Sequence, residues 1–125
     1  METREGKFLP VPHCIEGTPG WEINPSVAEA LESKKPYYIN KPTFGSVDLV
    51  KLVADIADVK ETEVELVGLC TDICVVSNAM LLKANYPEMN LYVDASCCAG
   101  VSKEAHRAAL DTMKSCQIVI LNDGE

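Results

Sequence analysis

The second half of the chain alternates between short apolar runs and longer segments that carry apolar residues at three- and four-residue spacing. The short runs predict buried strands over residues 64–69, 91–95 and 117–121. The longer segments predict helices over residues 73–85 and 102–115, the second with Ser102 as its N-cap. Strands and helices in this order indicate right-handed crossovers and a parallel sheet with helices on its faces, which is an α/β fold.

The first half has a weaker pattern. Residues 1–22 are rich in Pro and Gly and predict irregular structure. Residues 25–33 predict a short helix capped by Asn24. PYYIN, residues 36–40, is rich in β-forming residues and predicts a short strand. Residues 47–59 have the spacing of an amphipathic helix.

Composition narrows the class of protein. The chain has 125 residues, 47% of them hydrophobic, which is enough for one core and one domain. Its net charge of −8 argues against nucleic acid or an anionic membrane as a partner. No apolar run approaches the roughly 20 residues that span a bilayer, and METREGKFLPVPHC lacks the hydrophobic segment of a signal peptide. A cytoplasmic protein is expected.

Six cysteines raise two structural alternatives, a disulfide scaffold and a zinc site. They are Cys14, Cys70, Cys74, Cys97, Cys98 and Cys116. Disulfide-rich domains are usually small, secreted and poor in core residues, unlike this chain, and the adjacent Cys97 and Cys98 suit a buried strand end better. The spacing C-x3-C without a second pair, and with only His13 and His106 in the chain, argues against zinc.

Cys74 lies near the carboxyl end of a predicted strand, where parallel sheets bind ligands. The strand predicted over 64–69 ends just before Cys70, Thr71 and Asp72, and a helix follows. With Thr71 or Asp72 as N-cap, Cys74 falls in the first helical turn, where backbone N–H groups stabilise a thiolate. The alternative is that Cys74 is a small buried hydrophobic residue. Cys70 is expected to serve packing, and Asp72 is expected to cap the helix rather than act as a base.

The stretch GLCTDICVVSNAM, residues 68–80, resembles the motif of the isochorismatase-like cysteine hydrolases, which include nicotinamidases. The resemblance implies a three-layer α/β/α fold with a parallel sheet, and Cys74 as the nucleophile. It also implies a cis peptide bond between Leu69 and Cys70. The backbone N–H groups of Cys70 and Cys74 would then form the oxyanion hole.

Two further segments are similar to parts of the same family pattern. NKPTFGSVDL resembles its lysine segment, which makes Lys41 the counterpart of the catalytic lysine. VPHCIEGTPGWE resembles the nicotinamidase segment in which a histidine binds a divalent metal ion of the zinc or iron type, which matches His13. Alone, Lys41 would be read as a surface lysine and His13 as a loop histidine. Asp94 matches the loop after the fifth strand of the family, where it is expected to line the wall of the site. His106 is expected at the protein surface.

The family pattern starts upstream of what this chain contains. It includes a first strand that ends in the general-base aspartate, and a second strand followed by an Asp-x-His pair of metal ligands. Nothing before His13 matches these, so the metal ligand set is incomplete. We expect residues 1–125 to be a single isochorismatase-like hydrolase domain lacking its first two strands, as a fragment, a misassigned start or a genuine truncation. The strands over 64–69, 91–95 and 117–121 are expected to remain a parallel unit.

The predicted function is hydrolysis of a small amide such as nicotinamide to the acid and ammonia, through a thioester on Cys74, in a homo-oligomer. The isolated chain is expected to be inactive because the aspartate is absent. Two alternatives remain. One is a non-catalytic remnant that serves binding or assembly. The other is an isochorismatase-type hydrolase that acts on a different small substrate.

Overall fold

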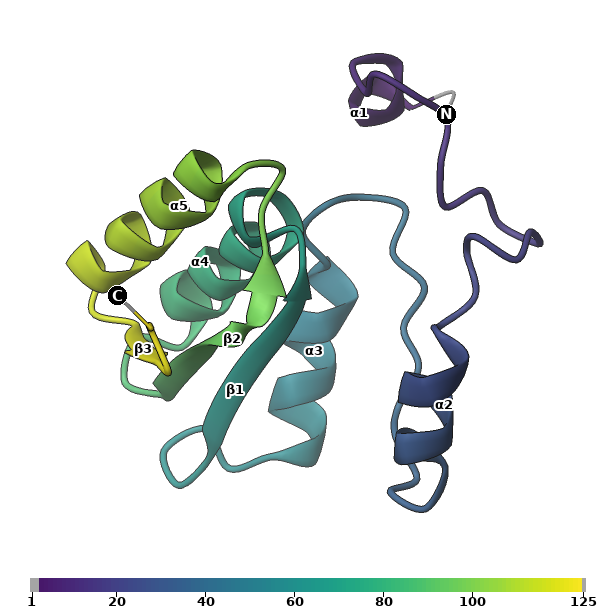
Figure 1. Ribbon diagram of the computed structural model, residues 1–125. Helices are drawn as coiled ribbons and strands as arrows, with labels where there is room; N and C mark the ends of the chain where they lie inside the picture. Colours follow the sequence, from purple (N-terminus) through teal and green to yellow (C-terminus); the bar gives the residue numbers. More distant parts are fainter. Residues whose placement is uncertain (1–2, 125) are drawn as a thin grey trace. The chain divides into compact units, whose positions relative to one another are not determined.

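The computed structural model describes residues 3–124 of the chain. The chain divides into two compact units, Met1–Asn40 and Lys41–Glu125 (Figure 1).

The first unit contains two short helices. Helix α2, Pro25–Glu32, follows the N-cap Asn24, whose side chain accepts a hydrogen bond from the Ser26 N–H, as the sequence predicts. Helix α1, Arg4–Lys7, was not predicted. It forms because the Thr3 hydroxyl accepts a hydrogen bond from the Gly6 N–H and caps a single turn.

The predicted strand over residues 36–40 is wrong. These residues have no regular secondary structure, and the side chains of Tyr37 and Tyr38 are 66% and 67% exposed. β-propensity expresses a fit to a neighbouring strand and to a half-buried surface more than a preference of the backbone. The described part of this unit offers no neighbouring strand, so the β-forming residues stay unpaired.

The second unit is built on a three-stranded parallel sheet in the order β1-β2-β3, which confirms the predicted α/β fold. Its strands are β1 Glu63–Leu69, β2 Asn90–Ala99 and β3 Val119–Leu121. Strand β2 runs four residues beyond its predicted end. Its register against β1 shifts between Leu66, which pairs with Val93, and Gly68, which pairs with Cys98. This bulge keeps β2 beside β1 up to the point where β1 ends.

Three helical segments lie on one face of this sheet (Figure 1). They are α3 Val47–Ile56, the π-helical turn η1 Thr71–Val75 continued by α4 Val76–Asn85, and α5 Lys103–Ser115. The core lies between helices and strands. Leu82, Leu110 and Met113 come from the helices, and Leu91 and Val93 come from β2. Ser102 caps α5 as predicted, with its hydroxyl accepting from the Ala105 N–H.

The opposite face of the sheet carries exposed apolar side chains. Val67 and Leu69 of β1 are 56% and 67% exposed, and Val119 of β3 is 49% exposed. On β1 they alternate with half-buried residues that face the helices, as the two-residue period of a strand requires. Among the residues described, β1 pairs on one side only, with β2. Within the same residues, no helix combines the length and apolarity needed to cross a bilayer.

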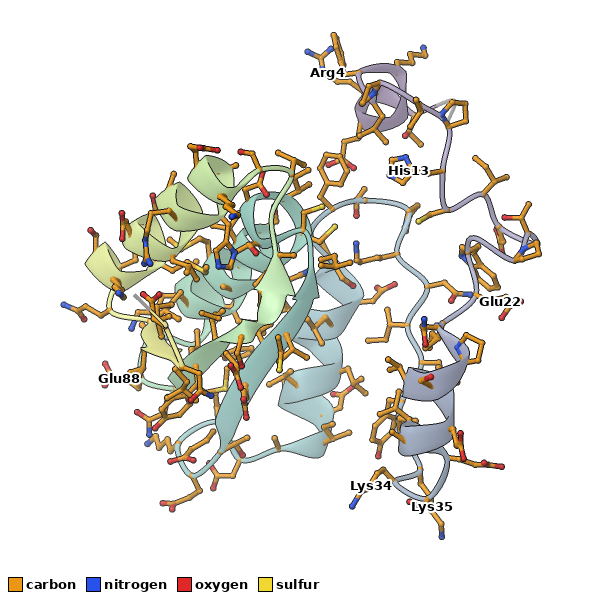
Figure 2. All side chains as sticks on the ribbon, in the orientation of Figure 1. Arg4, His13, Glu22, Lys34, Lys35 and Glu88 are labelled. Atoms are coloured by element: carbon orange, nitrogen blue, oxygen red, sulfur yellow. The ribbon has the colours of Figure 1, made fainter. Side chains whose placement is uncertain are left out.

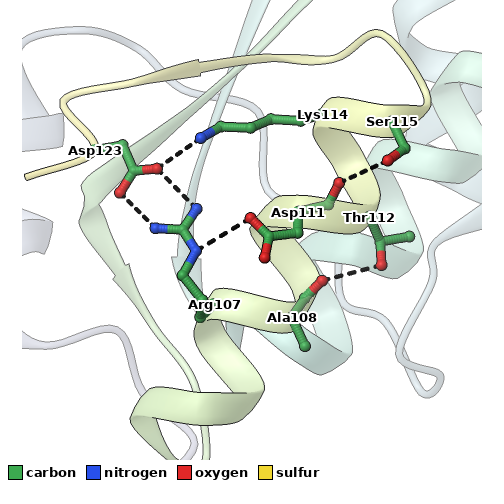
Figure 3. A network of polar contacts seen from close by, with 7 residues as sticks. All are labelled: Arg107, Ala108, Asp111, Thr112, Lys114, Ser115 and Asp123. Carbon is green, nitrogen blue, oxygen red and sulfur yellow. Dashed lines mark hydrogen bonds and ion pairs between the residues drawn. The ribbon is translucent and has the colours of Figure 1, made fainter. Parts of the chain in front are cut away.

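An ion-pair network attaches the end of the chain to α5 (Figure 3). The Arg107 guanidinium donates two hydrogen bonds of 2.8 Å to the Asp123 carboxylate, and Lys114 Nζ donates a third of 2.8 Å. Arg107 Nε also lies 3.2 Å from Asp111, whose side chain is 64% exposed. Because Asp123 lies two residues after β3, the network fixes the short last strand against the helix.

This network predicts how stability depends on pH. Hydrogen bonds from Arg107 and Lys114 hold the pKa of Asp123 well below its usual range. A carboxyl group whose pKa is lower in the folded state stabilises the fold above its unfolded pKa of about 3.9, and this stabilisation is lost as the pH falls further. Asp123→Asn is therefore expected to lower the urea midpoint at pH 7, with a difference from wild type that shrinks below about pH 4.

The matched control is Asp111→Asn, which removes one exposed carboxylate from the same arginine. It should shift the midpoint less, because exposed i,i+4 pairs contribute little. Equal shifts for the two variants would contradict the assigned role of Asp123.

Candidate active site

The candidate site begins where β1 ends. The peptide bond between Leu69 and Cys70 is cis, and the chain enters η1 directly after it. The Val75 N–H donates to the Cys70 carbonyl over five residues, which is the π-helical spacing. Cys74 therefore lies in a π-helical turn at the carboxyl end of a parallel strand, a position where α/β proteins bind ligands.

Cys74 and Lys41 are brought together although 33 residues separate them in the sequence. Lys41 Nζ lies 3.2 Å from Cys74 Sγ and 3.3 Å from the Thr43 carbonyl oxygen. Lys41 is exposed and Cys74 is half-buried. Cys74 Sγ therefore has an ammonium group within hydrogen-bond distance, and part of the cysteine remains accessible to solvent.

The side chain of Asn78 holds the lysine segment against the cysteine turn. Its Nδ2 donates to the Phe44 carbonyl at 3.2 Å and to the Cys74 carbonyl at 2.9 Å, while its Oδ1 accepts from the Ser46 N–H at 2.7 Å. Asn78 and Ser46 are both buried. One amide thus joins the segment after Lys41 to the helix after Cys74.

Sequence reasoning did not single out Asn78. It lies four residues after Cys74, so the two share one helix face. A buried amide needs a hydrogen-bond partner for each polar atom. An Asn among the apolar residues of a buried helix was therefore the signal in the sequence that could have identified Asn78.

The predicted capping roles of Thr71 and Asp72 are wrong. Cys70 occupies the N-cap position of η1, and no side chain caps it. The Thr71 hydroxyl instead lies 2.7 Å from His106 Nδ1, and Asp72 Oδ1 accepts from the Val101 N–H at 3.1 Å. The predicted surface position of His106 is also wrong, because this contact leaves the ring half-buried.

All six cysteines are free thiols with different surroundings. Cys14 and Cys97 are exposed, so the expectation that Cys97 lies in a buried strand end is wrong. Burial raises the pKa of the half-buried Cys98 thiol, which makes it a weaker nucleophile near neutral pH. Asp94 lies on the same strand as Cys97 and Cys98, and it accepts hydrogen bonds from Ser96 and Asn122.

His13 lies in the first unit, on the irregular segment after α1 (Figure 2). Its ring is exposed, and Nδ1 lies 2.9 Å from the Val11 carbonyl oxygen. Residues 3–124 contain no group of three His, Cys, Asp or Glu side chains that could hold a metal ion. The residues present therefore do not form a metal site, and the predicted role of His13 stays a prediction.

Comparison with protein families decides the class of this chain. The isochorismatase domain family matches residues 2–123, almost the whole sequence. The chain belongs to the isochorismatase family.

Relatives within the isochorismatase family include amidases. A nicotinamidase/pyrazinamidase from Mycobacterium tuberculosis is 32% identical over 116 residues, which cover 88% of this chain and 61% of that protein. The crystal structure of a nicotinamidase/pyrazinamidase from Bacillus subtilis matches with a TM-score of 0.79 at 26% identity, over 95% of this chain and 66% of that one. The chain thus spans about two thirds or less of the length of these relatives.

The pyrazinamidase of Pyrococcus horikoshii, whose crystal structure is a complex with zinc, matches with a TM-score of 0.66 at 23% identity, over 88% of this chain and 61% of that one. At this identity the match supports the isochorismatase fold alone.

The role of Asn78 can be tested by truncation. Asn78→Ala leaves the buried Ser46 N–H without its partner, which is expected to lower the free energy of unfolding by about 1–3 kcal/mol. It should also slow alkylation of Cys74 by iodoacetamide, because the segment that carries Lys41 is no longer held. Urea unfolding and peptide mapping of the alkylated protein measure the two effects.

Asn85→Ala is the matched control, because Asn85 lies on the same helix and donates to the Leu81 carbonyl four residues back, but is exposed. It should change stability by less than about 0.5 kcal/mol and leave Cys74 alkylation unchanged. A loss in Asn85→Ala equal to that in Asn78→Ala would refute the assignment.

Proposed function

We propose that this chain carries the nucleophile of a nicotinamidase-like cysteine amidohydrolase. The substrate would be a small amide such as nicotinamide, and the products the carboxylic acid and ammonia. The observation that carries the proposal is the distance of 3.2 Å between Lys41 Nζ and Cys74 Sγ in a member of the isochorismatase family. The names of the mycobacterial and Bacillus relatives support the choice of an amide substrate.

The reaction has two steps. The Cys74 sulfur attacks the amide carbonyl carbon and forms a thioester while the carbon–nitrogen bond breaks, and the thiol proton leaves with the nitrogen as ammonia. Water then hydrolyses the thioester, which gives the acid and restores the thiol. Lys41 stabilises the thiolate by its charge. The N–H groups of Cys70 and Cys74 are the proposed donors to the oxyanion in each step.

The proposed surroundings of the enzyme follow from two further features. Six free thiols suit a reducing compartment, which supports a cytoplasmic location. The exposed Val67, Leu69 and Val119 on one sheet face support association with another chain, and a homo-oligomer is proposed.

An activated ester tests the nucleophile directly. Phenyl nicotinate presents the same acyl group as nicotinamide, but its leaving group departs without an added proton. We expect the protein to acquire one nicotinoyl group on Cys74, detected by mass spectrometry of the intact protein and of its peptides. Lys41→Met should slow acylation by about three- to tenfold, because an exposed charge pair contributes about 1 kcal/mol.

Lys51→Met removes an exposed lysine from α3 and should leave the rate unchanged, while Cys74→Ser should abolish acylation at this position. If the ester labels Cys14 or Cys97 as fast as Cys74, the nucleophile assignment fails. That result would favour the alternative of a non-catalytic binding or assembly protein.

Turnover of the amide makes a different demand, because the nitrogen needs a proton to leave. The aspartate of the family triad has no counterpart that we identify in residues 1–125. We therefore expect the 125-residue chain to release little or no ammonia from nicotinamide, measured by a coupled ammonia assay. Robust release would show that a group within the chain moves this proton.

A further inference from the structure

We propose that Asp72 and Thr71 are positioning residues that fix the cysteine turn to the start of α5. The inference rests on the proposed role of Cys74 as nucleophile. It assigns a function to the two residues whose side chains do not cap η1. We call the set Thr71, Asp72, Gly100, Val101 and His106 the η1–α5 clamp.

The first contact of the η1–α5 clamp is made by a carboxylate. Asp72 Oδ1 accepts a hydrogen bond of 3.1 Å from the Val101 N–H. Val101 immediately precedes Ser102, the N-cap of α5. Asp72 lies two residues before Cys74 in the sequence. Its carboxylate thus binds the backbone between β2 and α5. A carboxylate held in this way anchors the turn, and its hydrogen bond does not involve the sulfur.

The second contact lies beside the first and is buried. The Thr71 side chain is fully inaccessible to solvent, and its hydroxyl lies 2.7 Å from His106 Nδ1 in the first turns of α5. A buried hydroxyl without a partner is costly, so this hydrogen bond favours one arrangement of η1 against α5. Two consecutive residues of η1 are therefore bound to α5 and to the loop that leads into it.

Gly100 shows how closely the two segments approach. A Cβ atom at this position would lie 2.8 Å from the His106 backbone nitrogen, 2.9 Å from Asp72 Oδ1 and 3.0 Å from His106 Cα. Two of these three atoms belong to the backbone of α5 and cannot rotate away. Glycine is needed here for close approach, which indicates that the contact is tightly packed.

The η1–α5 clamp is the third set of contacts that holds the turn carrying Cys74. Strand β1 holds the turn from its start, Asn78 holds it from the following helix, and the clamp holds it from α5. An attacking atom must be placed accurately relative to the oxyanion donors, and a displacement of about 1 Å can cost a hundredfold in rate. The clamp should therefore affect attack on a carbonyl group more than simple reactivity of the thiol.

Two reactions of the same thiol separate these effects. Acylation by phenyl nicotinate passes through an oxyanion, whereas alkylation by iodoacetamide needs only an accessible thiolate. Asp72→Ala is expected to lower the acylation rate of Cys74 by about tenfold to a hundredfold, with a much smaller change in alkylation. Loss of the fold would instead expose all six thiols, so Cys74 would lose its advantage over Cys14 and Cys97 in both reactions.

The conservative variant decides between positioning and proton transfer. Asp72→Asn keeps the Oδ1 acceptor for the Val101 N–H but removes the charge, so it should restore acylation to within about threefold of wild type. Thr71→Ser keeps the hydroxyl, so its Cys74 should be acylated faster than that of Thr71→Val. Asp58→Ala is the control, because Asp58 Oδ1 accepts from the Lys60 N–H in an exposed turn between α3 and β1.

The outcomes separate this inference from the proposed function. If wild-type Cys74 is not acylated by the ester, the proposed function fails and the inference fails with it. If wild type is acylated and Asp72→Ala reacts at the same rate, only the clamp is refuted. Equal losses in Asp72→Asn and Asp72→Ala would also overturn the positioning role and point to the carboxylate as a base.

Discussion

The geometry of this site depends on one buried amide. Asn78 bonds the Phe44 carbonyl, the Cys74 carbonyl and the Ser46 N–H, and so joins two segments that are distant in the sequence. Ser46 in turn caps α3 by accepting from the Leu49 N–H, so the same loop both starts a helix and carries the lysine. The position of Lys41 beside Cys74 thus follows from packing in the second unit, and both helices contribute to it.

The parts of the fold that the sequence predicts are those with local causes. Short apolar runs mark β1 and β2 because part of each strand packs against the helices. Ser102 and Asn24 cap helices because the N–H groups they bond lie two or three residues away. Lys41 and Cys74 are distant in the sequence, and only the resemblance to the family indicated that they meet.

The predictions that are wrong each depended on a partner that the sequence does not reveal. Residues 36–40 have strand composition, but the described residues of the first unit provide no strand beside them. Thr71 and Asp72 are good capping residues, but their side chains bond to His106 of α5 and to Val101 before it. Local propensity states what a residue can do, and tertiary contacts decide which option is used.

The charged and the neutral contacts of the cysteine turn differ in their exposure to solvent. Lys41 is exposed, so water weakens its attraction to the sulfur, and exposed pairs of this kind contribute about 1 kcal/mol or less. The contacts of Asn78 and Thr71, by contrast, are buried and leave little freedom to the turn that carries Cys74. In the proposed reaction, the accuracy with which these contacts hold the turn then matters at least as much as the charge of Lys41. The hydrogen bonds that fix the turn engage the Cys74 carbonyl and the Thr71 hydroxyl, so they set the position of the sulfur without occupying it.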